Sequence, residues 1–187
     1  MKLPSPGILG LILFASEVSL GLTRRSQKDA AATDANSLRL LWIVIMASVI
    51  LGMKAIRFWP EALLPHRPAW ALIGLIVFVL GLVLRWYAII HLGRFFTVNV
   101  AIAADHQLVE TGPYRFVRHP SYTGALLAFL GFALSLGNWA AILVLVLPIF
   151  AAFVYRMNVE ERALRSALGQ SYLAYIARTR RLLPFIY

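Results

Sequence analysis

The stretch LVETGPYRFVRHPSYTG, residues 108–124, interrupts the apolar blocks of this sequence and is neither hydrophobic enough to span a bilayer nor a bland linker. Pro113 and Pro120 push the residues before them out of the helical region, so Gly112 and His119 should be extended or in turns. The polar and aromatic side chains then lie on a bent, non-helical segment just before an apolar helix. Such a segment can line a pocket for a small polar molecule. The alternative is a juxtamembrane loop, with Arg on lipid phosphates and Tyr in the interfacial belt.

The overall composition is that of a polytopic membrane protein. Of 187 residues, 60% are hydrophobic and 14% are charged, whereas soluble domains carry about 25% charged residues. The absence of Cys excludes disulfides and thiolate metal sites, and the four His show no metal-ligand spacing, so no metal is predicted. We interpret the net charge of +10 as basic flanks facing anionic lipid on the cytoplasmic side. No nucleic-acid partner is predicted.

Five apolar blocks predict membrane-spanning helices. They run from about residues 4–22, 38–56, 69–92 and 121–137, and from 139 onward, and a span needs about 20 residues. The predicted fold class is an all-α integral membrane protein with about five transmembrane helices, in which a cytosolic loop and C-terminal helices form the site for a small polar molecule.

One domain of 187 residues is all that this length allows. We assign its parts in chain order as three spanning helices, a cytosolic loop that carries this site, a helical hairpin and a cytosolic tail, over residues 1–92, 93–120, 121–157 and 158–187.

Turn-forming residues predict where the last helices begin, bend and end. Gly137 and Asn138 should form a tight hairpin, and Pro148 should kink the fifth helix. Gly169 should end that helix after it has projected about two to three turns beyond the bilayer. Residues 170–179 should form a helix lying on the surface.

The distribution of Lys and Arg predicts the orientation. With the amino terminus outside, most of the 18 Lys and Arg residues lie in cytoplasmic segments. Residues 108–124 and the tail then meet on the cytoplasmic side. Glu17 is an intramembrane acid and therefore a functional hypothesis. The preferred alternative is a carboxylate near the interface that snorkels or pairs with Arg24 or Arg25.

Two pairs of opposite charges follow where the fifth helix leaves the lipid. Arg156 and Glu160 are four residues apart, as are Glu161 and Arg165, so each pair shares a helix face. Surface ion pairs, each stabilising by a few tenths of a kcal/mol, explain Glu161 and Arg165 well. They explain Arg156 and Glu160 less well, because that pair can line the same cavity as residues 108–124.

GPYRFVRHPSYTG, followed by an Arg-x-x-x-Glu-Glu helix end, LGxxYxxY and RLLP, resembles the isoprenylcysteine carboxyl methyltransferase family, here as a prokaryotic-type integral-membrane member. The resemblance covers residues 99–184, and the first half of the chain matches only as apolar spans. RHPxYxG alone is shared with phospholipid methyltransferases and membrane sterol reductases, whereas HxLVxxGxY upstream and Glu-Glu downstream are more specific. Asn99 stands where the family has Gln, and Asn158 and Val159 stand where eukaryotic members have a longer acidic run.

The resemblance implies an S-adenosylmethionine site without a Rossmann fold, with S-adenosylhomocysteine as product. The residues that it implies for cofactor binding are His106, Leu108, Val109, Tyr114, His119, Pro120, Ser121, Tyr122 and Glu160. It implies that Arg156 meets the acceptor, so Arg156 and Glu160 are the predicted catalytic residues. Whether His119 acts through its ring or its backbone stays open. The start of the fourth helix offers backbone N–H groups for a carboxylate.

Methyl transfer needs chiefly positioning and exclusion of water. A carboxylate acceptor is already a nucleophile at neutral pH and could be oriented by Arg156, whereas an amine would need Glu160 or Glu161 as base. We therefore predict methyl transfer to a lipid-like acceptor, favouring a carboxylate such as that of a prenylcysteine analogue. The predicted partners are the lipid bilayer and a lipophilic small molecule or prenylated acceptor, and the oligomeric state stays open. The alternatives are an NADPH-dependent membrane reductase of the sterol reductase type and a non-enzymatic scaffold.

Overall fold

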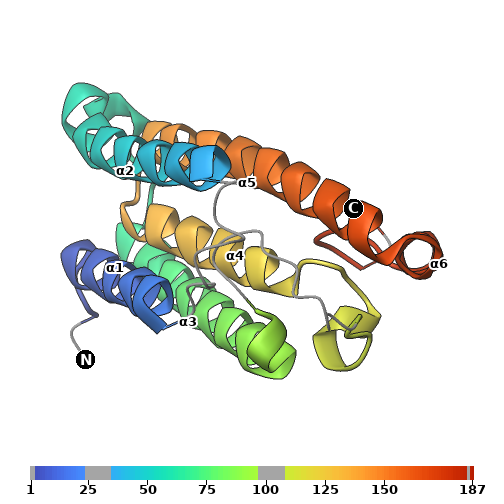
Figure 1. Ribbon diagram of the computed structural model, residues 1–187. Coiled ribbons are helices and arrows are strands. Elements are labelled where there is room, and N and C mark those ends of the chain that lie inside the picture. The colour runs from blue at the N-terminus through green and yellow to red at the C-terminus, as the bar shows by residue number, and fades with distance from the viewer. Residues whose placement is uncertain (1–2, 24–34, 97–107, 185) are drawn as a thin grey trace.

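The computed structural model describes residues 3–23, 35–96, 108–184 and 186–187. These residues form helices joined by turns (Figure 1). The α-helices are α1 Pro6–Thr23, α2 Ala35–Phe58, α3 Arg67–Leu92, α4 Pro120–Ser135, α5 Trp139–Leu168 and α6 Gln170–Arg178. Short 3-10 helices are η2 Pro60–Ala62, η3 Gly93–Phe95 and η4 Gly112–Arg115. The predicted all-α class is confirmed for the described residues.

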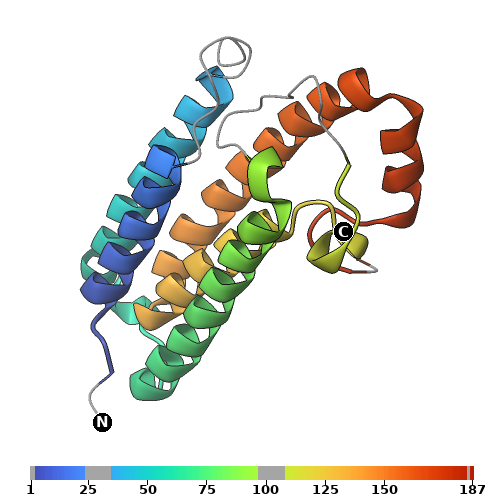
Figure 2. The same ribbon diagram turned by 60° about the horizontal axis from the view of Figure 1, so that its bottom comes forward.

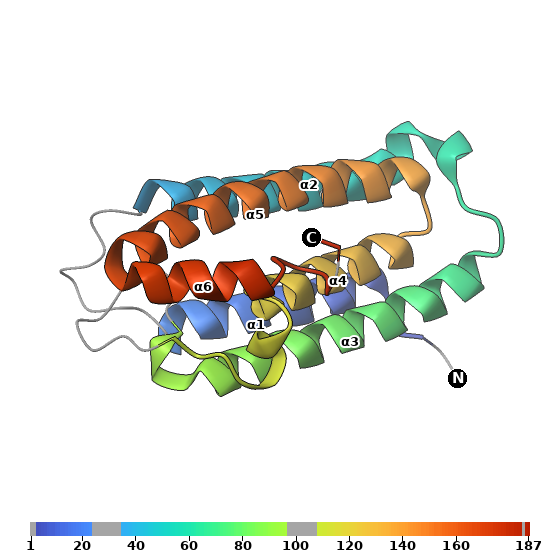
Figure 3. The ribbon, with the colours of Figure 1, turned by 90° about the vertical axis from the view of Figure 1, so that its right-hand side faces the viewer.

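Two antiparallel helix pairs make up the body of the molecule. Figures 1 and 3 show α2 beside α5 and α3 beside α4, with α1 against the second pair. Apolar side chains from both pairs meet in one core, whose large members include Phe78, Phe129, Phe132, Leu145 and Ile149. By length and composition α1, α2, α3 and α5 could each cross a membrane, whereas α4 is a shorter apolar helix of 16 residues. The prediction of about five spans therefore stays a prediction.

Glycines set the close approach of α3 and α4. A Cβ at Gly74 would lie 2.6 Å from the carbonyl oxygen of Gly131, and a Cβ at Gly81 would lie 2.7 Å from that of Gly124. Both helices thus carry two glycines seven residues apart, facing each other with their backbones in contact. Small residues at such spacing are typical of helix packing in membranes. The last turns of α3 are thereby fixed beside the start of α4.

The hairpin between α4 and α5 forms where the sequence predicts it. Gly137 has a φ of +62°, a left-handed conformation that favours glycine. The Asn138 side chain accepts from the Ala141 backbone N–H at 2.9 Å and caps α5. Helix α5 is continuous through Pro148 and ends at Gly169, whose φ is +54°. After that residue α6 folds back toward the body of the molecule, as Figures 2 and 3 show.

Candidate functional site

Tyr114 ties the segment before α4 to the helices on either side. It lies in η4 and is only 5% exposed. Its hydroxyl donates to the carbonyl of Ala88 in α3 at 3.2 Å, and its own carbonyl accepts from the Tyr175 hydroxyl of α6 at 2.7 Å. Burial raises the pKa of Tyr114 well above its ordinary value, so its hydroxyl stays a donor. The side chain predicted to contact a cofactor is thus packed against α3.

Glu161 is the centre of the most highly charged cluster among the described residues. Its carboxylate is 2% exposed and accepts from Arg118 Nε at 3.1 Å and from Arg181 Nη2 at 2.9 Å. The ring of His119 lies 3.2 Å from the same carboxylate, and Arg165 lies 3.6 Å away. The interpretation of Glu161 as one half of a surface ion pair is therefore wrong. The Arg165 contact exists, but three further cationic or hydrogen-bonding groups cover the carboxylate.

The tail supplies part of this cover because it runs parallel to residues 116–119. The Arg118 N–H donates to the Arg180 carbonyl at 2.7 Å, and the His119 N–H donates to the Arg181 carbonyl at 3.0 Å. The N–H of Arg180 donates in turn to the Phe116 carbonyl at 3.3 Å. Sequence reasoning expected the tail to meet residues 108–124 but missed this ladder, because RTRRLLP has no alternation that marks a strand.

Tyr122 joins the two elements on which the predicted site depends. Its hydroxyl donates to Glu160 Oε2 at 2.9 Å, which links the start of α4 to the last turns of α5. The rings of His119 and Tyr122 lie 5.5 Å apart, and Tyr122 also packs against Phe153 at 5.1 Å. Glu160 is half-buried. The predicted residues His119, Tyr122 and Glu160 thus lie together.

Arg156 lies at the junction of α2, α4 and α5 and is 2% exposed. Its Nη1 donates to Ser37 Oγ at 2.5 Å, and its guanidinium is near enough to Tyr122 to act on that phenol electrostatically. Both predicted catalytic residues therefore interact with Tyr122, Glu160 through a hydrogen bond and Arg156 through its charge. Neither Ser37 nor this role of Tyr122 was predicted.

The remaining predicted cofactor residues are spread along the approach to α4. Leu108 and Val109 are half-buried, whereas Pro120 and Ser121 are buried in the first turn of α4. His106 lies outside the described residues.

The first turn of α4 satisfies most of its own amides. The N–H groups of Tyr122 and Thr123 donate to the His119 carbonyl at 3.0 and 3.1 Å. The expectation that this helix start offers free N–H groups to a carboxylate is therefore wrong for Tyr122 and Thr123.

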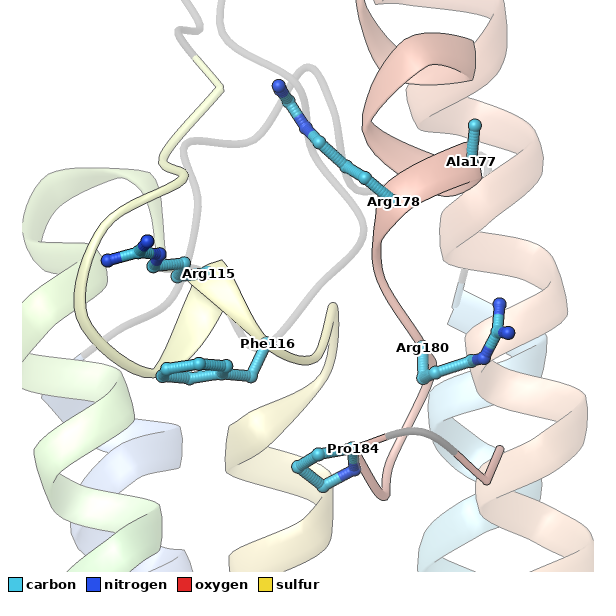
Figure 4. Close-up of a pocket in the computed structure, with 6 residues that line it drawn as sticks. All are labelled: Arg115, Phe116, Ala177, Arg178, Arg180 and Pro184. Carbon is cyan, nitrogen blue, oxygen red and sulfur yellow. The ribbon is translucent and has the colours of Figure 1, made fainter.

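A surface cleft of about 220 Å³ lies between η4 and the end of α6 (Figure 4). It is lined by Arg115, Phe116, Ala177, Arg178, Arg180 and Pro184. In Figure 4 the three guanidinium groups spread away from one another. None of the predicted cofactor or catalytic residues that the structure describes lines this cleft, so it is separate from the site around Tyr122.

Comparison with known proteins adds independent findings. The family model for phospholipid methyltransferases matches residues 70–171. A protein-S-isoprenylcysteine O-methyltransferase B of Arabidopsis thaliana is 35% identical over 115 residues, which cover 60% of this chain and 58% of that protein. A protein of Oryza sativa subsp. japonica, named "Probable protein-S-isoprenylcysteine O-methyltransferase", is 29% identical over 184 residues, or 94% and 92% of the two chains.

A solved structure of the eukaryotic intramembrane Ras methyltransferase ICMT is also similar. It superposes with a TM-score of 0.63 at 33% identity, over 78% of this chain and 52% of that one. The chain thus matches little more than half of the Arabidopsis relative and of the solved chain. Together these matches confirm the family resemblance that the motifs indicated, and with the apolar helices they support an integral membrane protein.

Proposed function

Since the chain belongs to the phospholipid methyltransferase family, we propose that it transfers a methyl group from S-adenosylmethionine to the carboxylate of a lipid-like acceptor such as a prenylcysteine. The names of the Arabidopsis and rice relatives support this acceptor class. The observation that carries the proposal is the 2.9 Å hydrogen bond from Tyr122 to Glu160, which joins the HPSY element to the Glu-Glu helix end.

The residues around Tyr122 fit a methyl donor of this kind. S-adenosylmethionine supplies an electrophilic methyl group on a cationic sulfur, and its transfer breaks the S–CH₃ bond, forms an O–CH₃ bond and releases no proton. One oxygen of Glu160 accepts the hydrogen bond from Tyr122, and the carboxylate can still accept hydrogen bonds from ribose hydroxyls or an ammonium group. Leu108 and Val109 are half-buried apolar side chains suited to an adenine. We assign binding of the methyl donor to these residues, and His119 to the lining of the same pocket.

We propose that Arg156 binds the carboxylate of the acceptor. A guanidinium that is 2% exposed is poorly solvated and favours an anionic partner. Its planar fork can hold a carboxylate bidentately, which fixes the attacking oxygen. The apolar tail of the acceptor would lie among the helices, where the surroundings are also apolar.

We further propose that the site faces the cytoplasm and that the amino terminus lies outside. Helix α6, η4 and the carboxyl-terminal end of α5 lie at one end of the molecule (Figure 3). Together with Arg118 and the tail, these segments carry 8 of the 14 Lys and Arg residues in the described chain. The positive-inside rule favours such an end as the cytoplasmic one.

Transfer of a labelled methyl group in detergent tests the activity. The acceptor panel contains a prenylcysteine with a free carboxylate, the same compound with its carboxylate blocked, and an aminophospholipid. We expect labelling of the first alone. Labelling of the aminophospholipid alone would overturn the carboxylate assignment.

Thermal unfolding distinguishes the competing functions. S-adenosylhomocysteine at about 100 times its Kd should stabilise the protein by about 2.7 kcal/mol. If NADPH raises the melting temperature and S-adenosylhomocysteine does not, the reductase alternative replaces this proposal. Arg156→Ala should reduce labelling while leaving the S-adenosylhomocysteine shift in place.

A further inference from the structure

An ion pair inside the apolar part of the bundle connects α1 to the start of α4. Arg85 of α3 is 7% exposed, and its Nη2 donates to Glu17 Oε2 of α1 at 2.7 Å. Its Nη1 donates to the carbonyl of Ser121 at 3.2 Å. Ser121 is the second residue of α4 and immediately precedes Tyr122. One guanidinium therefore spans three helices and reaches the backbone beside the site.

The guanidinium of Arg85 makes only one hydrogen bond to Glu17, because its other terminal nitrogen contacts Ser121. A bidentate Arg–carboxylate pair would use two nitrogens and both carboxylate oxygens. Here Nε of Arg85 and Oε1 of Glu17 are buried and have no hydrogen-bond partner among the described residues. Buried polar atoms are normally satisfied. Arg85 thus makes a single bond to Glu17 and turns its other terminal nitrogen toward Ser121.

The backbones around this contact leave little room for adjustment. A Cβ on Gly124 would lie 2.7 Å from the Cα of Arg85, so α3 and α4 touch at this level. The Cα of Arg85 is therefore fixed relative to α4, and the side chain alone sets the position of the guanidinium. Neutralising or removing the Glu17 carboxylate would leave that guanidinium buried without its counter-charge.

We propose that Glu17 and Arg85 are positioning residues for methyl transfer, through which α1 holds the first turn of α4 in register with α5. The assignment rests on the proposed function, because the register in question is that of Tyr122 with Glu160. A shift of Ser121 moves Tyr122 with it, and a displacement of about 1 Å at a reacting centre can reduce a rate by about 100-fold.

A charge-reversed double variant separates this role from simple stabilisation. Glu17→Arg combined with Arg85→Glu restores an ion pair, but a carboxylate at position 85 cannot donate to the Ser121 carbonyl. We expect a melting temperature near that of the wild type and a kcat about 10- to 100-fold lower. Arg85→Lys, which keeps the charge but lacks the two-armed guanidinium, should behave in the same way and serves if the double variant does not fold.

Ser16→Ala is the matched control. Ser16 accepts from Trp86 Nε1 at 2.9 Å, so this variant removes the neighbouring hydrogen bond between α1 and α3 without touching α4. Its kcat should equal that of the wild type.

Hydrogen–deuterium exchange provides a readout that needs neither methyl donor nor acceptor. Residues 114–124 should exchange faster in the double variant and in Arg85→Lys than in the wild type, whereas α2 should not change. Wild-type exchange and wild-type kcat in both variants would overturn the proposal. If the wild type methylates no acceptor, the proposed function fails, and the exchange of residues 114–124 still decides whether the pair positions α4.

Discussion

Glu161→Gln tests whether the charge cluster at the end of α5 holds the site together. The substitution preserves the shape of the side chain and one acceptor oxygen, but removes the charge that faces Arg118, His119 and Arg181. Arg118 and His119 are the buried partners, with side chains 9% and 4% exposed. Arg181 is 22% exposed and is therefore partly screened by solvent.

The magnitude follows from which partners are buried. Breaking a buried ion pair by removing one partner typically destabilises by about 3–5 kcal/mol. Because the amide still accepts from one or two donors and Arg181 is partly solvated, we expect the lower end, about 3 kcal/mol. For a chain of this length that corresponds to a fall in melting temperature of about 6–12 °C.

Glu110→Gln is the matched control, since it also removes a Glu–Arg pair. Glu110 pairs with Arg178, and both side chains are exposed, at 36% and 58%. A surface pair contributes about 0–1 kcal/mol, so the control should melt within about 4 °C of the wild type. Thermal unfolding of the two purified variants in the same detergent gives the comparison. If Glu161→Gln and Glu110→Gln melt together, the charge of Glu161 contributes no more than that of a surface residue, and the cluster does not hold the tail.

Three further substitutions test other parts of the structure. Gly131→Ala should destabilise by about 1–3 kcal/mol in thermal unfolding, because its Cβ would overlap the backbone of α3, and Gly21→Ala, with no atom within 4 Å, should not destabilise. Glu160→Gln should weaken S-adenosylhomocysteine binding in calorimetry, and unchanged affinity would remove Glu160 from the site. Tyr175→Phe should cost about 0.5–1.5 kcal/mol, because it removes the hydroxyl that donates to the Tyr114 carbonyl. Burial raises the pKa of Tyr175, so the wild type should lose stability as pH rises above about 10, where the unfolded state ionises first, and this loss should be smaller in Tyr175→Phe.

Local signals in the sequence were enough to predict the helices and their ends. Gly137, Asn138 and Gly169 act on the backbone within a few residues of themselves, so their effects do not depend on the rest of the fold. The glycine spacing that sets the α3–α4 contact was also present in the sequence. Gly74 and Gly81 match Gly124 and Gly131, and the repeat of seven in two apolar blocks is a readable sign of close helix packing that the sequence interpretation did not use.

Local signals could not predict contacts between residues that are far apart in the chain. The preferred prediction for Glu17 was a carboxylate near the interface that snorkels or pairs with Arg24 or Arg25, whereas the structure pairs it with Arg85. An acid and a base that both lie within apolar helices are each expensive to leave alone in lipid. They should therefore be tested first as partners of each other, whatever their separation in sequence.

The geometry of α5 explains why the two adjacent glutamates have different chemistry. Consecutive residues on an α-helix point about 100° apart, so Glu160 and Glu161 cannot face the same neighbour. Glu161 turns toward the tail, where cationic groups surround its carboxylate and leave it no capacity to take a proton from a substrate. Glu160 turns toward Tyr122 and already accepts a hydrogen bond there. Cationic neighbours neutralise Glu161, and our proposal assigns Glu160 to the methyl donor, so neither carboxylate is left as a dedicated base. An acceptor that is already ionised at neutral pH fits this arrangement better than an amine.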